Sequence, residues 1–549
     1  MMKLNIISIC ALVLTSCSNR NEPDIDLLVH NARIWTGDRA NPSASVMVIS
    51  GDRILAVGGQ ELKQRYIRGA RNVMDAEQRF ITPGFIDAHV HFLSGSYSLS
   101  SVSLRDAATP EEFARRIREK AASLPKGSWI LEGNWDHTLW GGELPEASWI
   151  DASTPDHPVC VARLDGHMVL ANTMAMGLAG ITAKTEDVEG GTIVRDGNGN
   201  PTGIFKDNAA SLIYRVIPEK TPAEDDAAFM EGMRFVASKG VTSVHNMDLE
   251  GPEIIEKYLR VKDEHIIRFY VGVDLSQWKA LDNYIRANGT GDEWLRIGFV
   301  KAMLDGSLGS HTAAFFEPYT DQPGNRGLYL LTKEALQEQS LQADAAGLQL
   351  AIHAIGDRAI HDLLDVYEQV IRQNGPRDRR LRIEHAQHIS PTDFIRFKEL
   401  HVIASMQPYH AIDDGRWVDG VIGRERSKTT YAFRSLLDAG VTLAFGSDWS
   451  VAPPTPLEGI YAAVTRRTLD GNNEAGWIPE EKITLEEALK AYTMDAACAS
   501  FEEEIKGSLA AGKLADFAIL DQNLLEIDPA QIKDVKVLRT YVGGNQVYP

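Results

Sequence analysis

The feature of the sequence with the clearest chemistry is a pair of histidines, His89 and His91, at the end of the segment PGFIDAHVH (83–91). In a β-strand, side chains two residues apart point to the same face, so both imidazoles would lie side by side. Neutral imidazoles bind borderline metal ions such as zinc. A lone His-x-His pair fits two polar residues at a strand end equally well, so its meaning depends on the rest of the chain.

Other ionisable residues also stand directly after apolar runs. They end four further expected strands, as Lys301, His353, His385 and Asp448. In a (β/α)8 barrel, catalytic side chains come from the carboxyl ends of several strands, which meet at one face of the barrel. The sequence therefore predicts a catalytic site at such a face, with the two histidines as candidate metal ligands.

The elements that must position these residues are short apolar runs separated by helical stretches. This alternation favours a (β/α)8 TIM barrel over an open doubly wound sheet and is expected to occupy residues 80–503. The eight expected strands cover residues 80–86, 240–244, 266–273, 297–303, 348–352, 381–383, 402–406 and 441–445. Residues from about 93 to 221 do not fit the repeat. They predict a long insertion after the first strand that overhangs the active face.

Both ends of the chain carry a different pattern, in which short β-branched runs alternate with turn residues. Residues 26–79 and 504–549 each offer too few strands for a stable sheet of their own. We therefore expect the two segments to combine into one small β-sandwich. The predicted fold class is α/β, with a barrel, an insertion and this terminal domain.

The first residues resemble a bacterial lipoprotein signal. Lys3 precedes the apolar run 4–14, which is too short to cross a bilayer and suits a signal peptide. The resemblance implies removal of residues 1–16, acylation of Cys17 and a polar tether over 17–25. A plain secretory signal with an incidental cysteine is the alternative. The expected location is the cell envelope, facing the periplasm or the exterior, with membrane contact only through this anchor.

Composition excludes several function classes. The 549 residues include 56 Lys and Arg against 76 Asp and Glu, which gives a formal net charge of −20. This balance argues against a nucleic-acid partner, because phosphates are bound by clustered Lys and Arg. A hydrophobic content of 44% with only four cysteines excludes a disordered chain and a disulfide scaffold.

The motifs together resemble the amidohydrolase superfamily, and within it the YtcJ-like group that includes N-substituted formamide deformylase. The resemblance covers essentially the whole mature chain. Besides PGFIDAHVH, it is carried by RLDGH (163–167), GVTSVH (240–245), KAMLDGSLGS (301–310), HAIGDRA (353–359), RIEHAQ (382–387), FGSDW (445–449), GSL (507–509) and GKLADF (512–517).

The resemblance implies one or two divalent metal ions, with zinc as the expected metal. The implied ligands are His89, His91, His353, His385 and Asp448. It also implies that Asp448 takes a proton from metal-activated water and passes it to the leaving nitrogen. In binuclear members, the lysine matching Lys301 becomes N6-carboxylysine and bridges two metals. The residues alone leave open a simple ion pair of Lys301 with Asp448 or Asp305 in a one-metal site.

A second group of residues is expected to contact a small-molecule substrate. Its members are Asp165, His167, Trp135, His311 and Gln407. The predicted reaction is hydrolysis of a non-peptide carbon–nitrogen bond in a linear amide, such as an N-formyl or N-acyl amine. The alternatives are a cyclic amide, lactone or ester at the same site, or a non-catalytic envelope lipoprotein. The last is disfavoured because every expected ligand position is occupied. Homodimers are frequent in similar proteins, but no interface is visible in the sequence.

Overall fold

The computed structural model describes residues 24–549. The expected export signal, Cys17 and nearly all of the expected tether lie outside the described residues. None of the helices from residue 24 onward combines the length and the apolarity that crossing a membrane requires.

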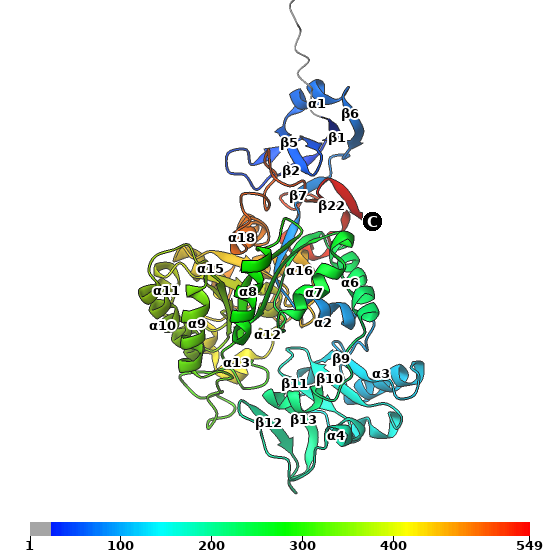
Figure 1. The fold of residues 1–549 in the computed structure, drawn as a ribbon, viewed down its shortest axis with the longest axis vertical. Helices are drawn as coiled ribbons and strands as arrows, with labels where there is room; N and C mark the ends of the chain where they lie inside the picture. Colours follow the sequence, from blue (N-terminus) through cyan, green and yellow to red (C-terminus); the bar gives the residue numbers. More distant parts are fainter. Residues whose placement is uncertain (1–23) are drawn as a thin grey trace, which may run out of the picture.

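Eight parallel strands form a barrel in the middle of the molecule (Figure 1). They are β8 (Phe85–Val90), β14 (Val241–Asn246), β15 (Arg268–Asp274), β16 (Leu295–Met303), β17 (Gln349–Ala354), β18 (Arg382–His385), β19 (Ile403–Met406) and β20 (Leu443–Phe445). Each strand pairs with the next one along the chain. A parallel bridge between Val90 and Trp449 returns the last strand to the first. The predicted eight-stranded barrel is confirmed.

The barrel is built from strands that are buried on both faces and helices that are buried on one. Strands β14 and β17 are buried along their whole length, as expected where helices cover a parallel sheet. Helix α10 (Asp357–Asn374) buries Ile360, Leu363 and Tyr367, which recur at helical spacing. Helix α6 (Pro222–Ala237) begins with a capping box between Thr221 and Glu224.

A five-stranded sheet lies between β8 and α6 in the sequence, at one end of the barrel (Figure 1). Its strands are β9 (Ile130–Trp135), β10 (Val159–Arg163), β11 (Met168–Ala171), β12 (Gly191–Arg195) and β13 (Pro201–Asp207). Helix α3 (Pro110–Ser123) packs on it through Phe113 and Ile117. We call residues 93–221 the insertion.

Two further sheets lie at the opposite end of the barrel and join both ends of the chain (Figure 1). One contains β1 (Ile25–His30), β4 (Val46–Ser50), β5 (Arg53–Gly58) and β6 (Ala70–Asp75). The other contains β2 (Arg33–Trp35), β3 (Ser43–Ala44), β7 (Phe80–Pro83), β21 (Phe517–Leu520), β22 (Val537–Val542) and β23 (Asn545–Tyr548). Leu27 and Ile49 of the first sheet share an apolar cluster with Ile81 and Phe517 of the second.

The run 80–86, expected as the first barrel strand, is divided at Gly84. Strand β7 pairs with β21 and β2 in the terminal sheet, and the barrel strand β8 starts only at Phe85. A Cβ at Gly84 would lie 2.2 Å from Thr242 Oγ1, so only glycine permits this close passage. The barrel therefore starts five residues later than predicted.

A buried ion pair fastens the C-terminal segment to the barrel. Arg268 on β15 donates from Nε and Nη2 to the two carboxylate oxygens of Asp516 at 2.7 and 2.9 Å. The side chains are 1% and 6% exposed. Asp516 Oδ1 also accepts the backbone N–H of Gly543 at 2.8 Å, so the carboxylate holds both the barrel and the last hairpin.

We expect Asp516→Ala to lower the free energy of unfolding by about 3 kcal/mol, because it leaves the buried Arg268 guanidinium without its partner. Urea unfolding followed by circular dichroism measures the change. The control is Asp156→Ala, which removes an ion pair whose side chains are 82% and 47% exposed and should change stability far less. Equal effects of the two substitutions would contradict the role assigned to the buried pair.

Candidate metal centre

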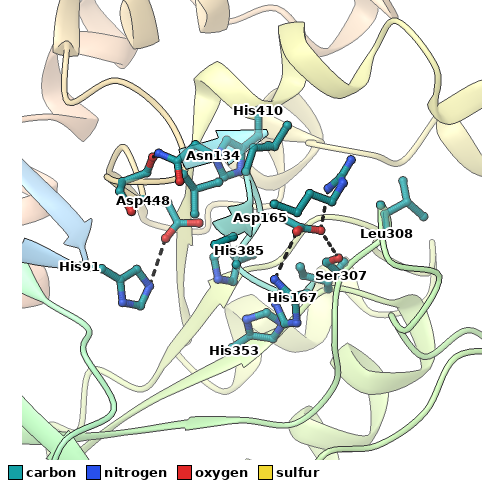
Figure 2. A pocket seen from close by; sticks show the side chains of 18 of the residues that line it. His91, Asn134, Asp165, His167, Ser307, Leu308, His353, His385, His410 and Asp448 are labelled. Carbon is teal, nitrogen blue, oxygen red and sulfur yellow. Dashed lines mark hydrogen bonds and ion pairs between the residues drawn. The ribbon is translucent and has the colours of Figure 1, made fainter. Parts of the chain in front are cut away.

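The carboxyl ends of the barrel strands and the insertion enclose a cavity of about 430 Å³ (Figure 2). The barrel contributes His91, Lys301, His353, His385 and Asp448. The insertion contributes Glu132, Asn134, Arg163, Asp165, His167 and Tyr214. The cavity thus lies at the face where barrels of this kind carry their active sites.

The five expected ligands come together at the floor of this cavity. One ligand atom each of His89, His385 and Asp448 lies within 4.8 Å of the other two. Asp448 Oδ1 is 3.4 Å from His89 Nε2 and 3.3 Å from His91 Nε2. The ring of His353 is 4.5 Å from that of His385, between centroids. Residues separated by up to 359 positions therefore form one cluster.

Acceptors behind the cluster determine which nitrogen each imidazole presents. In three of the four histidines, Nδ1 faces an oxygen that only accepts hydrogen bonds: Glu384 Oε2 for His89 at 2.6 Å, Asp248 Oδ1 for His91 at 3.1 Å, and Gln407 Oε1 for His385 at 2.8 Å. In their neutral form these rings donate Nδ1–H, which leaves the lone pair of Nε2 toward the cluster. His353 is reversed, because its Nε2 donates to the carbonyl of Gly306 at 3.2 Å and leaves Nδ1 available.

Two buried atoms of the cluster lie 3.4 Å apart without forming a hydrogen bond. His89 Nε2 and Asp448 Oδ1 form no hydrogen bond with the described residues. A buried acceptor left unpaired costs about 1–3 kcal/mol. Because lone pairs of imidazole and carboxylate converge here, the donor set fits a divalent metal ion of the borderline type.

The backbone of two ligands is strained. His385 has a φ of 71° and Asp448 a φ of 61°, in the left-handed region that residues other than glycine seldom adopt. Such conformations persist where the surrounding structure over-determines them, and they concentrate at functional sites. The strain therefore agrees with a site selected for the position of its side chains.

Electrostatics keep most of the cluster in the form that binds a metal. Burial and neighbouring positive charge hold the pKa values of His353 and His385 well below the usual range, so both rings are neutral. Burial would raise the pKa of Asp448, but His89 and His91 outweigh it and keep the carboxylate ionised. For His91, burial lowers the pKa, but Asp248 and Asp448 dominate and raise it to about 9.

Lys301 reaches the same cavity from β16 and is 1% exposed. Burial lowers the pKa of its amine to about 8. The ion pair expected as one alternative is absent among the described residues, since Asp448 contacts His89 and His91 instead. Asp305 accepts the backbone N–H groups of Ala314, Ile355 and Gly356 at 2.8, 3.0 and 2.9 Å.

Three of the five expected substrate contacts lie at or next to the cavity. Asp165 lines it and accepts from Arg163 Nη1 at 2.7 Å. His167 lines it beside His353 (Figure 2). Its Nδ1 contacts Asp207 at 2.8 Å. Gln407 lies behind His385 and orients that ring rather than facing the cavity.

Trp135 and His311 do not line the cavity, so these two predictions are corrected. Trp135 is fully buried in the core of the insertion, where Nε1 donates to the carbonyl of Val161 at 2.8 Å. His311 lies on a loop after β16 and contacts Asp321 at 2.8 Å. In place of Trp135, the same strand β9 presents Glu132 and Asn134, which the sequence analysis missed.

The comparisons with known proteins agree with this geometry. The model of a family described as "Amidohydrolase family" matches residues 72–548. The chain belongs to the amidohydrolase family. The resemblance inferred from the motifs is thereby confirmed, and the family is metal-dependent.

Several relatives cover nearly the whole chain. "Protein LONG AFTER FAR-RED 3" of Arabidopsis thaliana is 41% identical over 537 residues, which are 95% of this chain and 92% of that protein. The N-substituted formamide deformylase of Arthrobacter pascens is 29% identical over 549 residues, with 94% and 97% covered. The putative amidohydrolase YtcJ of Bacillus subtilis is 28% identical over 534 residues, with 94% and 98% covered.

Solved structures show the same architecture. An uncharacterized metal-dependent hydrolase from Pyrococcus horikoshii superposes with a TM-score of 0.75 at 28% identity, with 92% of this chain and 99% of that chain covered. Atrazine chlorohydrolase TrzN from Arthrobacter aurescens, complexed with zinc, superposes with a TM-score of 0.52 at 15% identity over 95% of each chain. At that identity the second likeness concerns the fold alone.

We expect Asp248→Asn to weaken metal binding by about 10- to 100-fold, because the neutral amide no longer fixes the His91 ring and its basicity. Titration of the metal-free protein with zinc against a competing chelator measures the affinity. Asp321→Asn is the matched control, since it changes the aspartate that contacts His311 outside the cavity. Unchanged affinity in Asp248→Asn would remove His91 from the ligand set.

Proposed function

We propose that this member of the amidohydrolase family is a hydrolase that cleaves the non-peptide carbon–nitrogen bond of a linear amide, of the N-formyl or N-acyl amine class. The observation that carries the proposal is the convergence of the unpaired His89 Nε2 and Asp448 Oδ1 at the floor of a cavity. The substrate class is supported by the 29% identity with N-substituted formamide deformylase over nearly the whole chain.

The residues that would hold the metal are His89, His91, His353, His385 and Asp448. Their imidazole and carboxylate donors are those that zinc prefers. When bound, a divalent ion of this kind activates water for attack and polarises the substrate carbonyl.

Asp448 is the group we assign to proton transfer. Its pKa is held well below the usual range, so the carboxylate is ionised and ready to accept a proton from water. It lines the cavity and therefore also reaches the substrate side. As the carbon–nitrogen bond breaks, the Asp448 carboxyl donates this proton to the leaving nitrogen, so that a neutral amine departs.

The central test is hydrolysis by purified protein that is stripped with a chelator and reloaded with zinc. We expect N-formyl and N-acyl amines to be cleaved faster than lactams, lactones and aryl esters of similar size. Asp448→Asn should lower kcat by about 100- to 10,000-fold, because the amide cannot carry the proton. Asp321→Asn serves as control. Full activity after chelation, or in Asp448→Asn, would overturn the proposal, and cleavage of esters alone would overturn the bond assignment.

We further propose that Lys301 carries a carboxylated amine that completes a binuclear site. Formation requires the neutral amine, whose nitrogen bonds to the carbon of carbon dioxide and releases a proton. The lowered pKa of about 8 supplies more of that neutral form than an exposed lysine would. The product would place one negative charge, shared by two oxygens, at the buried end of Lys301, which forms no ion pair with the described residues.

For Lys301→Ala, we expect the metal content to fall from two ions to one and kcat to fall by at least about 100-fold. Elemental analysis and steady-state kinetics measure the two quantities, and added acetate should restore part of the rate by supplying a carboxylate. Lys206→Ala, which changes a lysine of the insertion outside the cavity lining, is the control. Full metal content with full rate would exclude Lys301 from the centre.

A further inference from the structure

One carboxylate of the cavity wall has no role in the reaction described above. Glu132 lies on β9 of the insertion and lines the cavity across from the barrel. Residues Glu132, Gly133 and Asn134 have successive φ values of 62°, 112° and 57°, all in the left-handed region. The pairing of β9 with β10 shifts register at the same place. Such irregularities re-aim side chains next to active sites.

Glu132 has no partner among the described residues. Its carboxylate makes no ion pair or hydrogen bond, and burial raises its pKa to about 7. The charge of Lys220 lowers that pKa and the charge of Asp248 raises it. The Lys220 ammonium lies over the ring of Tyr97, 5.3 Å from the centroid. A half-buried carboxylate with no cation beside it gains free energy from any cation that enters the cavity.

Most other charged groups on the cavity wall are already paired, and Asp414, which has no Lys or Arg partner among the described residues, accepts the Tyr431 hydroxyl at 2.5 Å. Arg163 contacts Asp165 at 2.7 Å and Asp136 at 3.5 Å. Asp413 is held by Arg105 and Arg416. Apart from Lys301, which we assign to the metal centre, no free Lys or Arg among the described residues lines this cavity. The wall therefore offers a place for a positive group and none for a substrate carboxylate.

A second cavity of about 650 Å³ continues from the first. The two share Ser94, Glu132, Ala162 and Tyr214, so Glu132 stands at their junction. Its insertion side carries the apolar residues Leu131, Cys160, Val169 and Ile217, with the exposed Glu219 and Lys220 at the rim. Its opposite side carries Glu250, Glu253 and Glu256, together with Lys257 and Arg260. A chain that leaves the metal centre toward this opening must pass the Glu132 carboxylate.

We propose that Glu132 determines specificity, and that the substrate is an amide that also carries a protonated amine, such as a mono-N-acylated diamine. The ammonium pairs with Glu132 while the amide lies at the metal centre. Water adds to the carbonyl carbon, the carbon–nitrogen bond breaks, and a carboxylic acid and a diamine leave. This inference rests on the proposed function for the reaction, but the charge recognition is separable from it.

The same carboxylate excludes anionic substrates. A carboxylate in place of the ammonium would face Glu132 inside the cavity, where solvent screens the repulsion of like charges less than it does on the open surface. Glu132 therefore discriminates by charge in two ways, because it attracts a substrate ammonium and repels a substrate carboxylate. For a neutral amide of the same length, we expect an affinity between those of the cationic and the anionic substrate.

The test compares three substrates of equal length that differ only at the far end: N-formyl-1,4-diaminobutane, N-formylpentylamine and N-formyl-5-aminopentanoate. For the zinc-loaded wild type, we expect kcat/KM for the cation to exceed that for the neutral amide by about 10- to 100-fold, with the anion lowest. Glu132→Gln should abolish this preference and leave the neutral amide within about twofold. Glu219→Gln, at the exposed rim of the second cavity, is the control and should retain the preference.

A binding measurement separates this inference from the proposed function. Calorimetry with zinc-loaded Asp448→Asn protein should show tighter binding of N-formyl-1,4-diaminobutane than of N-formylpentylamine, and the difference should vanish when Glu132→Gln is added. Hydrolysis without charge preference would overturn the inference and leave the function standing. Charge-selective binding without hydrolysis of any amide by the wild type would overturn the function alone. Equal binding of both compounds would overturn the inference.

Discussion

The structure depends on how a buried carboxylate, Asp448, is kept ionised among imidazoles. His89 lies against it and in turn donates Nδ1–H to Glu384, which receives the guanidinium of Arg382 at 2.7 Å. Arg382 also contacts His245 Nδ1 at 3.1 Å. A row of contacting polar side chains therefore extends from the Asp448 carboxylate at the cavity to His245 in the barrel interior. Each buried charge needs the next one, because an unpaired member would lose its solvation without compensation. This row of side chains places polar groups in the barrel interior and holds the metal ligands at the carboxyl ends of the strands.

The insertion has a different task from the barrel. Through Arg163 and Asp165 it is tied to Ser307, whose hydroxyl donates to Asp165 at 2.5 Å on the loop after β16. The barrel therefore supplies the groups that act on the scissile bond, while the insertion supplies the wall that the remainder of the substrate meets. This division agrees with the general finding that a fold carries a chemistry and the surrounding loops choose its substrate.

The eight barrel strands and the ends at which they carry ligands could be predicted from the sequence, because buried parallel strands are nearly continuous apolar runs. The predictions that were wrong concern single side chains and one strand boundary. Trp135 was expected to contact the substrate, but it is buried in the core of the insertion. Three left-handed residues precede it on β9, where Glu132 and Asn134 line the cavity instead. The acceptors behind the histidines, such as Asp248, come from neighbouring strand ends, and no spacing in the sequence links them to their rings. The division of β7 from β8 at Gly84 depends on a contact with Thr242, which is equally non-local.

Charge acts on a substrate at two ranges in this molecule. The formal net charge of −20 creates a field that favours the approach of cations, but salt screens it beyond about 8 Å at physiological ionic strength. Glu132 acts at contact distance inside the cavity, where screening is weak. The field of the net charge arises from the whole surface and changes the rate of encounter with a substrate. The contact with Glu132 involves one side chain and changes how tightly a substrate is held. A preference that survives high salt must therefore come from the cavity wall, and among the described residues Glu132 is the unpaired carboxylate at the junction of both cavities.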